Sequence, residues 1–276
     1  MASSTWTWIG TTSNPDISSN WTLTAGPGNL LGRPQAGDTA IDAAGTIDFL
    51  ADDLQTTDNT IDVGGTAGLA ALFVAGSTQT NATTPTLDAS SVITSAVPGN
   101  TTAETTLLSA AGVFVNEGTI LADGPAGSSF TIAISGATIN GAFQPGYFFN
   151  PGTIQADAGN TLIINVGSAS ELFNPGTIIA DGGTVKVTYS SSAIAGGDAA
   201  MRGFYLIEGD GTLETAASYP VSDGNNGTHA YYEFADSTPG DTLKIDNVGS
   251  FGGVIAGFGP GDTVDLGTLL AVGTVA

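Results

Sequence analysis

The sequence predicts an all-β protein built as a β-solenoid, a chain that winds through successive coils of short strands. Three observations predict this fold. Long helical stripes have little room, since 40 of the 276 residues are glycine and 12 are proline. Short segments such as TLIINV, TVKVTY and TLKIDN alternate apolar with polar side chains, as strands with one buried face do. A motif also recurs at a spacing that is typical of solenoids.

That motif reads VFVNEGTILAD from Val113, FFNPGTIQAD from Phe148 and LFNPGTIIAD from Leu172. Its asparagines lie 34 and then 24 residues apart, so we expect rungs of about 24 residues and an inserted loop over 141–148 in the longer interval. Such a unit cannot bury its own apolar face and must stack on copies of itself. The repeat therefore indicates architecture rather than chemistry.

Each residue type in the repeat has an expected place in the coil. We expect the asparagines in turns, where Asn tolerates left-handed backbone and bonds to neighbouring backbone, and we expect stacked copies to form an amide ladder. The glycines are expected to supply positive φ angles. The isoleucine that follows each glycine is expected to stack in the core. The ladder positions are Asn116, Asn150 and Asn174, with Gly118, Gly152 and Gly176.

The two ends differ from the middle, which predicts three regions. Residues 1–42 form an N-terminal cap region, residues 43–200 the solenoid rungs, and residues 201–276 a C-terminal β region that continues or caps the solenoid. All three tryptophans, Trp6, Trp8 and Trp21, lie in the first region. We favour a cap over the first rung, with a carbohydrate-stacking platform as the alternative.

The charge is strongly acidic, with 26 Asp and Glu against four Lys and Arg, a formal net charge of -22. Nucleic-acid binding and attachment to an anionic membrane both need clustered Lys and Arg, so we expect neither. No apolar run approaches the length of a membrane span. The acidity fits either solubility by self-repulsion or contact with cations such as calcium.

The chain has no cysteine, and its first residues, MASSTWTWIG, do not form a secretory signal. Together with the acidity and the abundance of small polar residues, this composition favours a bacterial extracellular or cell-surface protein. Export would then use a route without a recognisable N-terminal signal.

Several motifs in order carry a family resemblance. They are GDTAID near the start, the N-x-GTI-x-AD rungs, and GDTLKID and FGGVIAGFGPGDTVDL near the end. In this order the sequence resembles autotransporter-passenger-like and type I-secreted bacterial adhesins. The resemblance implies a right-handed parallel β-helix, an extracellular place and a structural, adhesive or matrix role. The calcium-binding nonapeptide run of such secreted proteins is missing.

Catalysis is not expected. His229 is the only histidine, there is no cysteine, and no G-x-S-x-G elbow is present. Carboxylate pairs such as Asp52 with Asp53, and Glu208 with Asp210, keep a glycan-active enzyme or carbohydrate-binding module as the alternative.

Oxygen ligands for calcium are plentiful in three turns. Within each turn an aspartate and a later aspartate are expected to share a face with backbone carbonyls, although each could instead cap its own turn. The candidate pairs are Asp38 with Asp42, Asp241 with Asp246, and Asp262 with Asp265. Zinc is not expected with one His and no Cys.

The last ten residues, GTLLAVGTVA, are apolar and uncharged. Exposed strand edges are normally blunted by charge, proline or a cap, so this end is expected to dock head to tail on another copy, unless the tail folds back as a cap. The self-association candidates are Leu269, Leu270, Val272 and Val275. The expected function is thus an extracellular bacterial structural protein, forming a filament, surface layer or biofilm matrix or an adhesin stalk, with itself and surface glycans as partners.

Overall fold

The protein is described by a computed structural model of the 276-residue chain. The structure describes residues 4–9, 18–28, 31–34, 38–42, 45–49, 60–63, 70–74, 86–87, 89, 91–96, 101–139, 142–190, 203–215, 230–248, 251 and 253–267. Strands dominate these residues, and one short 3-10 helix, η1 (Ser18–Asn20), precedes β2. The predicted parallel β-solenoid is confirmed.

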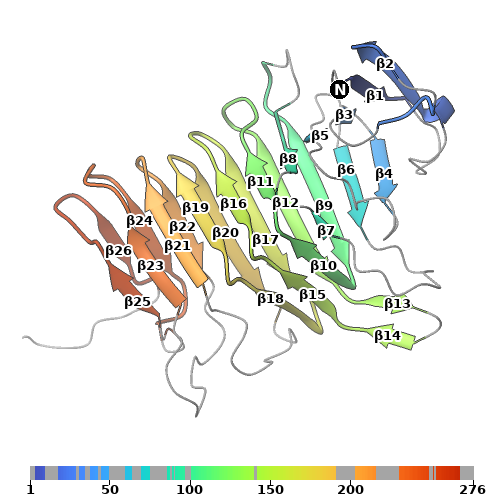
Figure 1. The fold of residues 1–276 in the computed structure, drawn as a ribbon. Helices are drawn as coiled ribbons and strands as arrows, with labels where there is room; N and C mark the ends of the chain where they lie inside the picture. The colour runs from blue at the N-terminus through green and yellow to red at the C-terminus, as the bar shows by residue number, and fades with distance from the viewer. Residues whose placement is uncertain are drawn as a thin grey trace, which may run out of the picture.

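Two long sheets run the length of the solenoid (Figure 1). Sheet A has 11 strands in the order β2 (Trp21–Ala25), β1 (Thr5–Trp8), β3 (Thr39–Asp42), β5 (Thr60–Val63), β8 (Val92–Thr94), β11 (Thr119–Ala122), β16 (Thr153–Ala156), β19 (Thr177–Asp181), β21 (Gly203–Glu208), β23 (Ala230–Phe234) and β25 (Val254–Ala256). Sheet B has nine strands, β4 (Gly45–Phe49), β6 (Ala70–Val74), β9 (Thr105–Ala111), β12 (Ser129–Ser135), β17 (Thr161–Val166), β20 (Thr184–Tyr189), β22 (Thr212–Thr215), β24 (Thr242–Ile245) and β26 (Thr263–Asp265).

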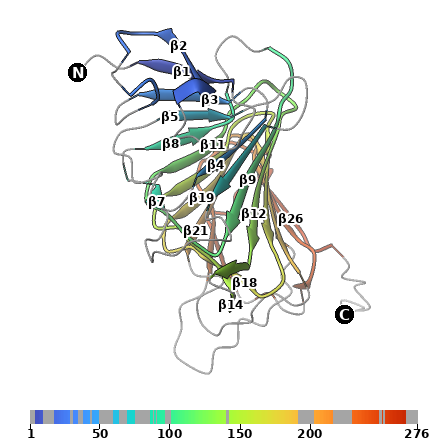
Figure 2. The same cartoon turned by 90° about the vertical axis from the view of Figure 1, so that its right-hand side faces the viewer.

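A shorter sheet lines the third side of the central rungs. Sheet C contains β7 (Thr86–Leu87), β10 (Val113–Asn116), β15 (Gly146–Phe149) and β18 (Ser170–Phe173). Along the chain a sheet C strand leads into sheet A and then into sheet B, and the strands of each sheet pair in parallel with those of the next rung. Figure 2 shows sheets A and B facing each other across the interior.

The longer repeat interval carries a hairpin rather than a loop over 141–148. Strands β13 (Ala137–Ile139) and β14 (Ala142–Gln144) pair antiparallel and project from the rung (Figure 1). Tyr147 and Phe148 belong instead to β15, where Phe148 pairs with Phe114 and is fully buried. The hairpin accounts for the longer spacing between Asn116 and Asn150. After the hairpin, Tyr147 and Phe148 return to the alternation of outward and inward side chains.

The core consists of inward columns of matching residues. In sheet A, Ile120, Ile154 and Ile178 are in register and fully buried. In sheet B the matching column runs through Leu162, Val185, Leu213 and Leu243, all fully buried. Successive side chains of a strand point to opposite faces, so every second side chain lies inside. This explains the alternation of apolar and polar residues in the sequence.

Candidate functional site

The N-terminal end of the solenoid is closed by tryptophans. Trp6, Trp8 and Trp21 are only 4%, 5% and 6% exposed, and the rings of Trp8 and Trp21 meet edge to face at 4.9 Å. β2 runs antiparallel to β1 and ends sheet A. Because the indole faces lie inside the core, they pack against the first rungs and do not form an exposed stacking platform.

Asp38, a predicted calcium ligand, holds this cap together. Its two carboxylate oxygens accept hydrogen bonds from the Ser4 backbone N–H at 2.8 Å and from Trp6 Nε1 at 3.1 Å. Its expected partner Asp42 ends β3, and the side chain of Asp42 lies outside the described residues. The described contacts of Asp38 are therefore structural.

The outer strand at the N-terminal end, β2, is uncharged and alternates threonine with apolar residues. The β2 sequence is WTLTA, and the four residues after Trp21 are exposed. Leu23 in β2 is 39% exposed, and Ile9 and Leu31 nearby in the chain are 57% and 54% exposed. An edge strand of this kind lacks the charges and prolines with which proteins usually block further strand pairing.

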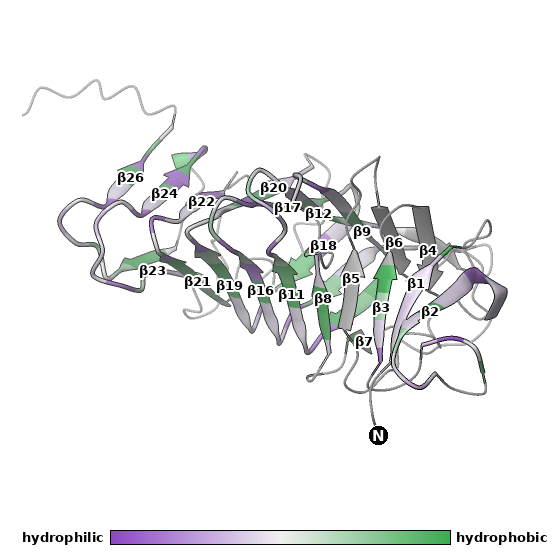
Figure 3. Cartoon of the chain, turned by 90° about the horizontal axis from the view of Figure 1, so that it is seen from above, coloured by the Kyte–Doolittle hydropathy of each residue, from purple (hydrophilic) through white to green (hydrophobic). Residues whose placement is uncertain are grey.

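The C-terminal end leaves the core uncovered in the described residues. The inward column of sheet A continues from Ile178 through Tyr205 and Tyr232 to Ile255. Both tyrosines are buried, whereas Ile255, in the same column, is 37% exposed. Leu266 after β26 is 39% exposed, and Phe258 is 55% exposed although its ring meets Phe234 at 5.3 Å. Figure 3 shows the β23 and β26 end opposite the end that carries β2.

The predicted self-association residues Leu269, Leu270, Val272 and Val275 lie outside the described residues. The exposed apolar residues Ile255, Phe258 and Leu266 precede them in the chain.

The three repeat asparagines form a directional amide ladder. Asn116 Nδ2 donates to Asn150 Oδ1, and Asn150 Nδ2 donates to Asn174 Oδ1, each at 2.6 Å, with all three residues fully buried. Leu87 occupies the matching position below Asn116. Consequently Asn116 Oδ1 has no hydrogen-bond donor at this end of the ladder. At the other end the Asn174 side chain lies beside the Tyr205 hydroxyl, close enough to affect its pKa.

The turn glycines were expected to have positive φ, and this was wrong. Gly118, Gly152 and Gly176 are not among the residues with positive φ, and neither are the ladder asparagines. The reason for glycine is space. A Cβ on Gly152 would lie 2.2 Å from the Gly118 carbonyl oxygen, and one on Gly176 would lie 2.2 Å from that of Gly152. The turns stack too closely for any side chain at this position.

The interior changes where sheet C ends. Beyond β18 the described rungs lack a sheet C strand, and Tyr205 and Tyr232 replace the isoleucines of the inward column. Their rings stack at 5.0 Å, and the larger side chains fill the interior. Burial raises the pKa of both phenols, against a smaller opposing effect of Asn174 on Tyr205.

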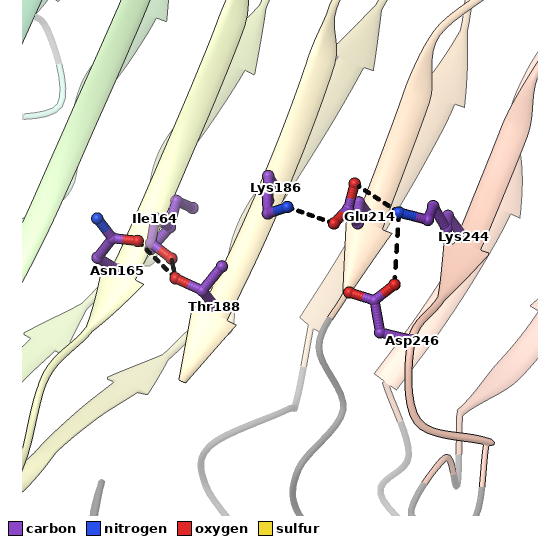
Figure 4. A network of polar contacts seen from close by, with 7 residues as sticks. All are labelled: Ile164, Asn165, Lys186, Thr188, Glu214, Lys244 and Asp246. Carbon is purple, nitrogen blue, oxygen red and sulfur yellow. Dashed lines mark hydrogen bonds and ion pairs between the residues drawn. The ribbon is translucent and has the colours of Figure 1, made fainter. Parts of the chain in front are cut away.

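The outer face of sheet B carries a ladder of alternating charge (Figure 4). Lys186, Glu214 and Lys244 are in register on β20, β22 and β24. The two Nζ atoms lie 2.5 and 3.1 Å from the two oxygens of Glu214, and Lys244 also lies 3.5 Å from Asp246. Burial alone would raise the pKa of Glu214, but its hydrogen bonds and charge contacts with the two lysines lower it overall.

Sequence reasoning missed this ladder, although a signal was present. The strands TVKV, TLET and TLKI all begin with threonine, and the threonines Thr184, Thr212 and Thr242 are in register. Alignment on threonine would have placed the charged third residues in one column.

The predicted calcium pairs within single turns do not converge in the described contacts. Asp246 contacts Lys244, and Asp265 Oδ1 accepts a hydrogen bond from the Gly267 backbone at 3.0 Å. Asp241 and Asp262 accept backbone hydrogen bonds from Gly211 and Gly259. Within the described part of the chain, no three His, Cys, Asp or Glu side chains gather in a way that could hold a metal ion.

The remaining candidates for chemistry are the histidine and the other carboxylate pairs. His229, Asp52 and Asp53 lie outside the described residues. Glu208 ends β21, and its pKa is raised by burial and by the charges of Asp181 and Asp236. In the ranges that the structure describes, no helix has the length and apolarity needed to cross a bilayer.

No protein-family model matches the chain, and no curated protein and no solved structure matches it either. The likeness to bacterial adhesins is therefore supported as far as the β-solenoid fold and no further.

Proposed function

We propose that this chain is an extracellular or cell-surface bacterial structural protein that joins copies of itself end to end. The observation that carries the proposal is the unfinished core at the C-terminal end, where Ile255 continues a buried column and is 37% exposed. Each rung of a solenoid buries its apolar face on the next, so the last described rung exposes a surface that a further layer would cover.

The N-terminal end offers a matching surface. β2 and β25 are the two outer strands of sheet A, and neither contains a charged residue. The outer strand of sheet B at the C-terminal end differs, because Asp265 in β26 is exposed. Pairing of β25 with β2 of the next molecule would continue sheet A across the junction, with β2 antiparallel as it is to β1.

Symmetry then determines the product. The two ends use different surfaces, so their contact is heterologous and leads to an open chain of molecules rather than a closed dimer. The net charge of -22 opposes side-by-side association of the rods, whereas the outer strands β2 and β25 carry no charged residue. Such a chain would serve as filament, surface layer, matrix component or adhesin stalk.

Lysine substitutions at the two ends test the proposal. We expect the full chain to form elongated assemblies in sedimentation velocity and negative-stain electron microscopy, and Leu23→Lys or Ile255→Lys to shorten them, since each places a charge on one joining edge. Phe143→Lys is the matched control, because Phe143 is 60% exposed on the β14 hairpin, which pairs with no strand of sheet A. Monomeric parent protein, or equal loss in the control, would contradict end-to-end association.

One observation favours a second function, binding of a neutral glycan. Phe204 and Tyr231 are 51% and 44% exposed on neighbouring strands of sheet A, with ring centroids 6.0 Å apart. Paired exposed rings provide a surface on which sugars can stack. Glycan-array binding that disappears in Phe204→Ala with Tyr231→Ala, while assembly persists, would establish this function separately.

A further inference from the structure

The two P-G-D-T turns of the C-terminal region lie directly on one another. Thr242 pairs in register with Thr263, and the Thr263 backbone N–H donates to the Asp241 carbonyl at 2.8 Å. A Cβ on Gly261 would lie 2.3 Å from Pro239 Cβ, so the turns are in close contact. Asp241 and Asp262 therefore occupy equivalent positions on neighbouring rungs.

Each of these carboxylates is half satisfied. The Gly211 backbone N–H donates to Asp241 Oδ1 at 2.9 Å, and the Gly259 backbone N–H donates to Asp262 Oδ2 at 2.8 Å. The second oxygen of each, Asp241 Oδ2 and Asp262 Oδ1, is buried and has no hydrogen-bond partner. Asp241 is fully buried. Burying a carboxylate oxygen without a partner costs free energy, and native proteins normally give such an atom a hydrogen bond or an ion. The two free oxygens therefore call for a ligand.

The described lysines do not supply it. Lys186 and Lys244 are both bonded to Glu214 on the outer face of sheet B. Asp236, a further acidic group near the turns, is already bonded through both oxygens to Thr238 and Gly209. Burial raises the pKa of Asp241, and the charges of Asp236 and Asp262 raise it further. Hydrogen bonding from the backbones of Gly211 and Asp210 offsets this only in part.

We propose that Asp241 Oδ2 and Asp262 Oδ1 together bind a calcium ion that bridges the two turns. The site lies between rungs rather than within one turn, so Asp246 and Asp265 are not its ligands. Hard carboxylate oxygens suit calcium, and backbone carbonyls and water complete its shell. With only two carboxylates the affinity falls in the range of weak extracellular sites, on the order of 0.1–1 mM. The proposal is independent of end-to-end association.

Calcium titration of the full, chelator-stripped chain tests the site. We expect the melting temperature to rise with calcium, with half of the effect between about 0.1 and 1 mM, and a smaller rise with magnesium, which prefers rigid octahedral sites. Isothermal titration calorimetry with calcium alone gives the stoichiometry, expected to be one ion per chain.

Four variants separate the inter-rung site from the alternatives. Asp241→Asn and Asp262→Asn should abolish the calcium-dependent rise, whereas Asp246→Asn and Asp265→Asn should retain it. If Asp241→Asn does not fold, the less buried Asp262→Asn carries the test. A calcium response that survives Asp262→Asn, or one lost in Asp265→Asn, overturns the proposal. The proposal is also overturned if the parent protein shows no response to calcium. If its stability then rises on acidification, the two carboxylates share a proton instead.

Discussion

The amide ladder makes single residues responsible for the register of the central rungs. Asn150 is its middle member, donating to Asn174 and accepting from Asn116. Asn150→Ala removes two bonds at once and leaves Asn174 Oδ1 without its donor inside the core. We expect a loss of roughly 2–5 kcal/mol in the free energy of unfolding, measured by urea denaturation.

The matched variant for this prediction is Asn116→Leu. Leu87 already occupies the neighbouring position in the column. The substitution removes one ladder bond and the longer bond, 3.2 Å, from Asn116 Nδ2 to the Thr153 carbonyl, and the leucine fills the space. It should therefore cost less than Asn150→Ala. Equal losses of unfolding free energy in the two variants would mean that the middle asparagine contributes no more to stability than the end one.

At the same scale, the sequence allowed some residue roles to be predicted and not others. Repetition placed the three asparagines in one column, and a column of amides in a parallel stack has an obvious pairing. The glycine two residues after each asparagine had two possible reasons, left-handed backbone or lack of space. Sequence alone does not distinguish them, because the clash on Gly152 comes from the neighbouring rung and not from its own dihedral angles.

Among elements, the stacked turns explain where glycine is irreplaceable. Gly152→Asn should cost more than about 3 kcal/mol, because a Cβ there meets the backbone oxygen of Gly118. Gly127→Asn is the control, since Gly127 has φ +91°, which Asn tolerates, and its Cβ would lie 3.6 Å from Ala103 Cβ. Thermal unfolding of both variants measures the difference. A loss in Gly152→Asn no larger than that in Gly127→Asn would contradict the explanation from lack of space.

The charge ladder on strands β20, β22 and β24 of sheet B predicts a contribution to the free energy of unfolding that depends on pH. Since the folded state lowers the pKa of Glu214, its ion pairs stabilise the fold above the usual glutamate pKa and are lost as pH falls through the lowered value. Glu214→Gln should cost up to about 1 kcal/mol at pH 7, because the lysines are partly exposed.

That cost should shrink below about pH 4, and also at high salt, which screens partly exposed charges. Urea denaturation across pH and ionic strength measures it, with the exposed Glu117→Gln as control. A cost that stays constant from pH 7 to pH 3 would show that the carboxylate charge is not what stabilises these strands.

At the scale of the whole molecule, the sequence allowed the solenoid to be predicted but not the structure of its two ends. Periodic alternation and a repeated unit are local signals, so strands and stacking followed from them. The longer repeat interval predicted an insertion before β15 but not its pairing as the hairpin β13–β14. The change from Ile178 to Tyr205 accompanies the end of sheet C at β18, which no local pattern marks. The two ends could not be described from the pattern, because exposure at an end depends on the next layer and not on the residues themselves.

Cross-linking of single-cysteine variants tests end-to-end association most directly, because the natural chain contains no cysteine. Thr22→Cys marks the start of β2, and Ala256→Cys marks the end of β25, two positions that antiparallel pairing would bring together. We would treat each variant alone, and an equal mixture of both, with a short flexible bismaleimide. Covalent dimers in the mixture, and none in either variant alone, is the result that head-to-tail joining of sheet A predicts. Dimers of Ala256→Cys alone would indicate tail-to-tail pairing, and no dimers in the mixture would contradict association through these strands.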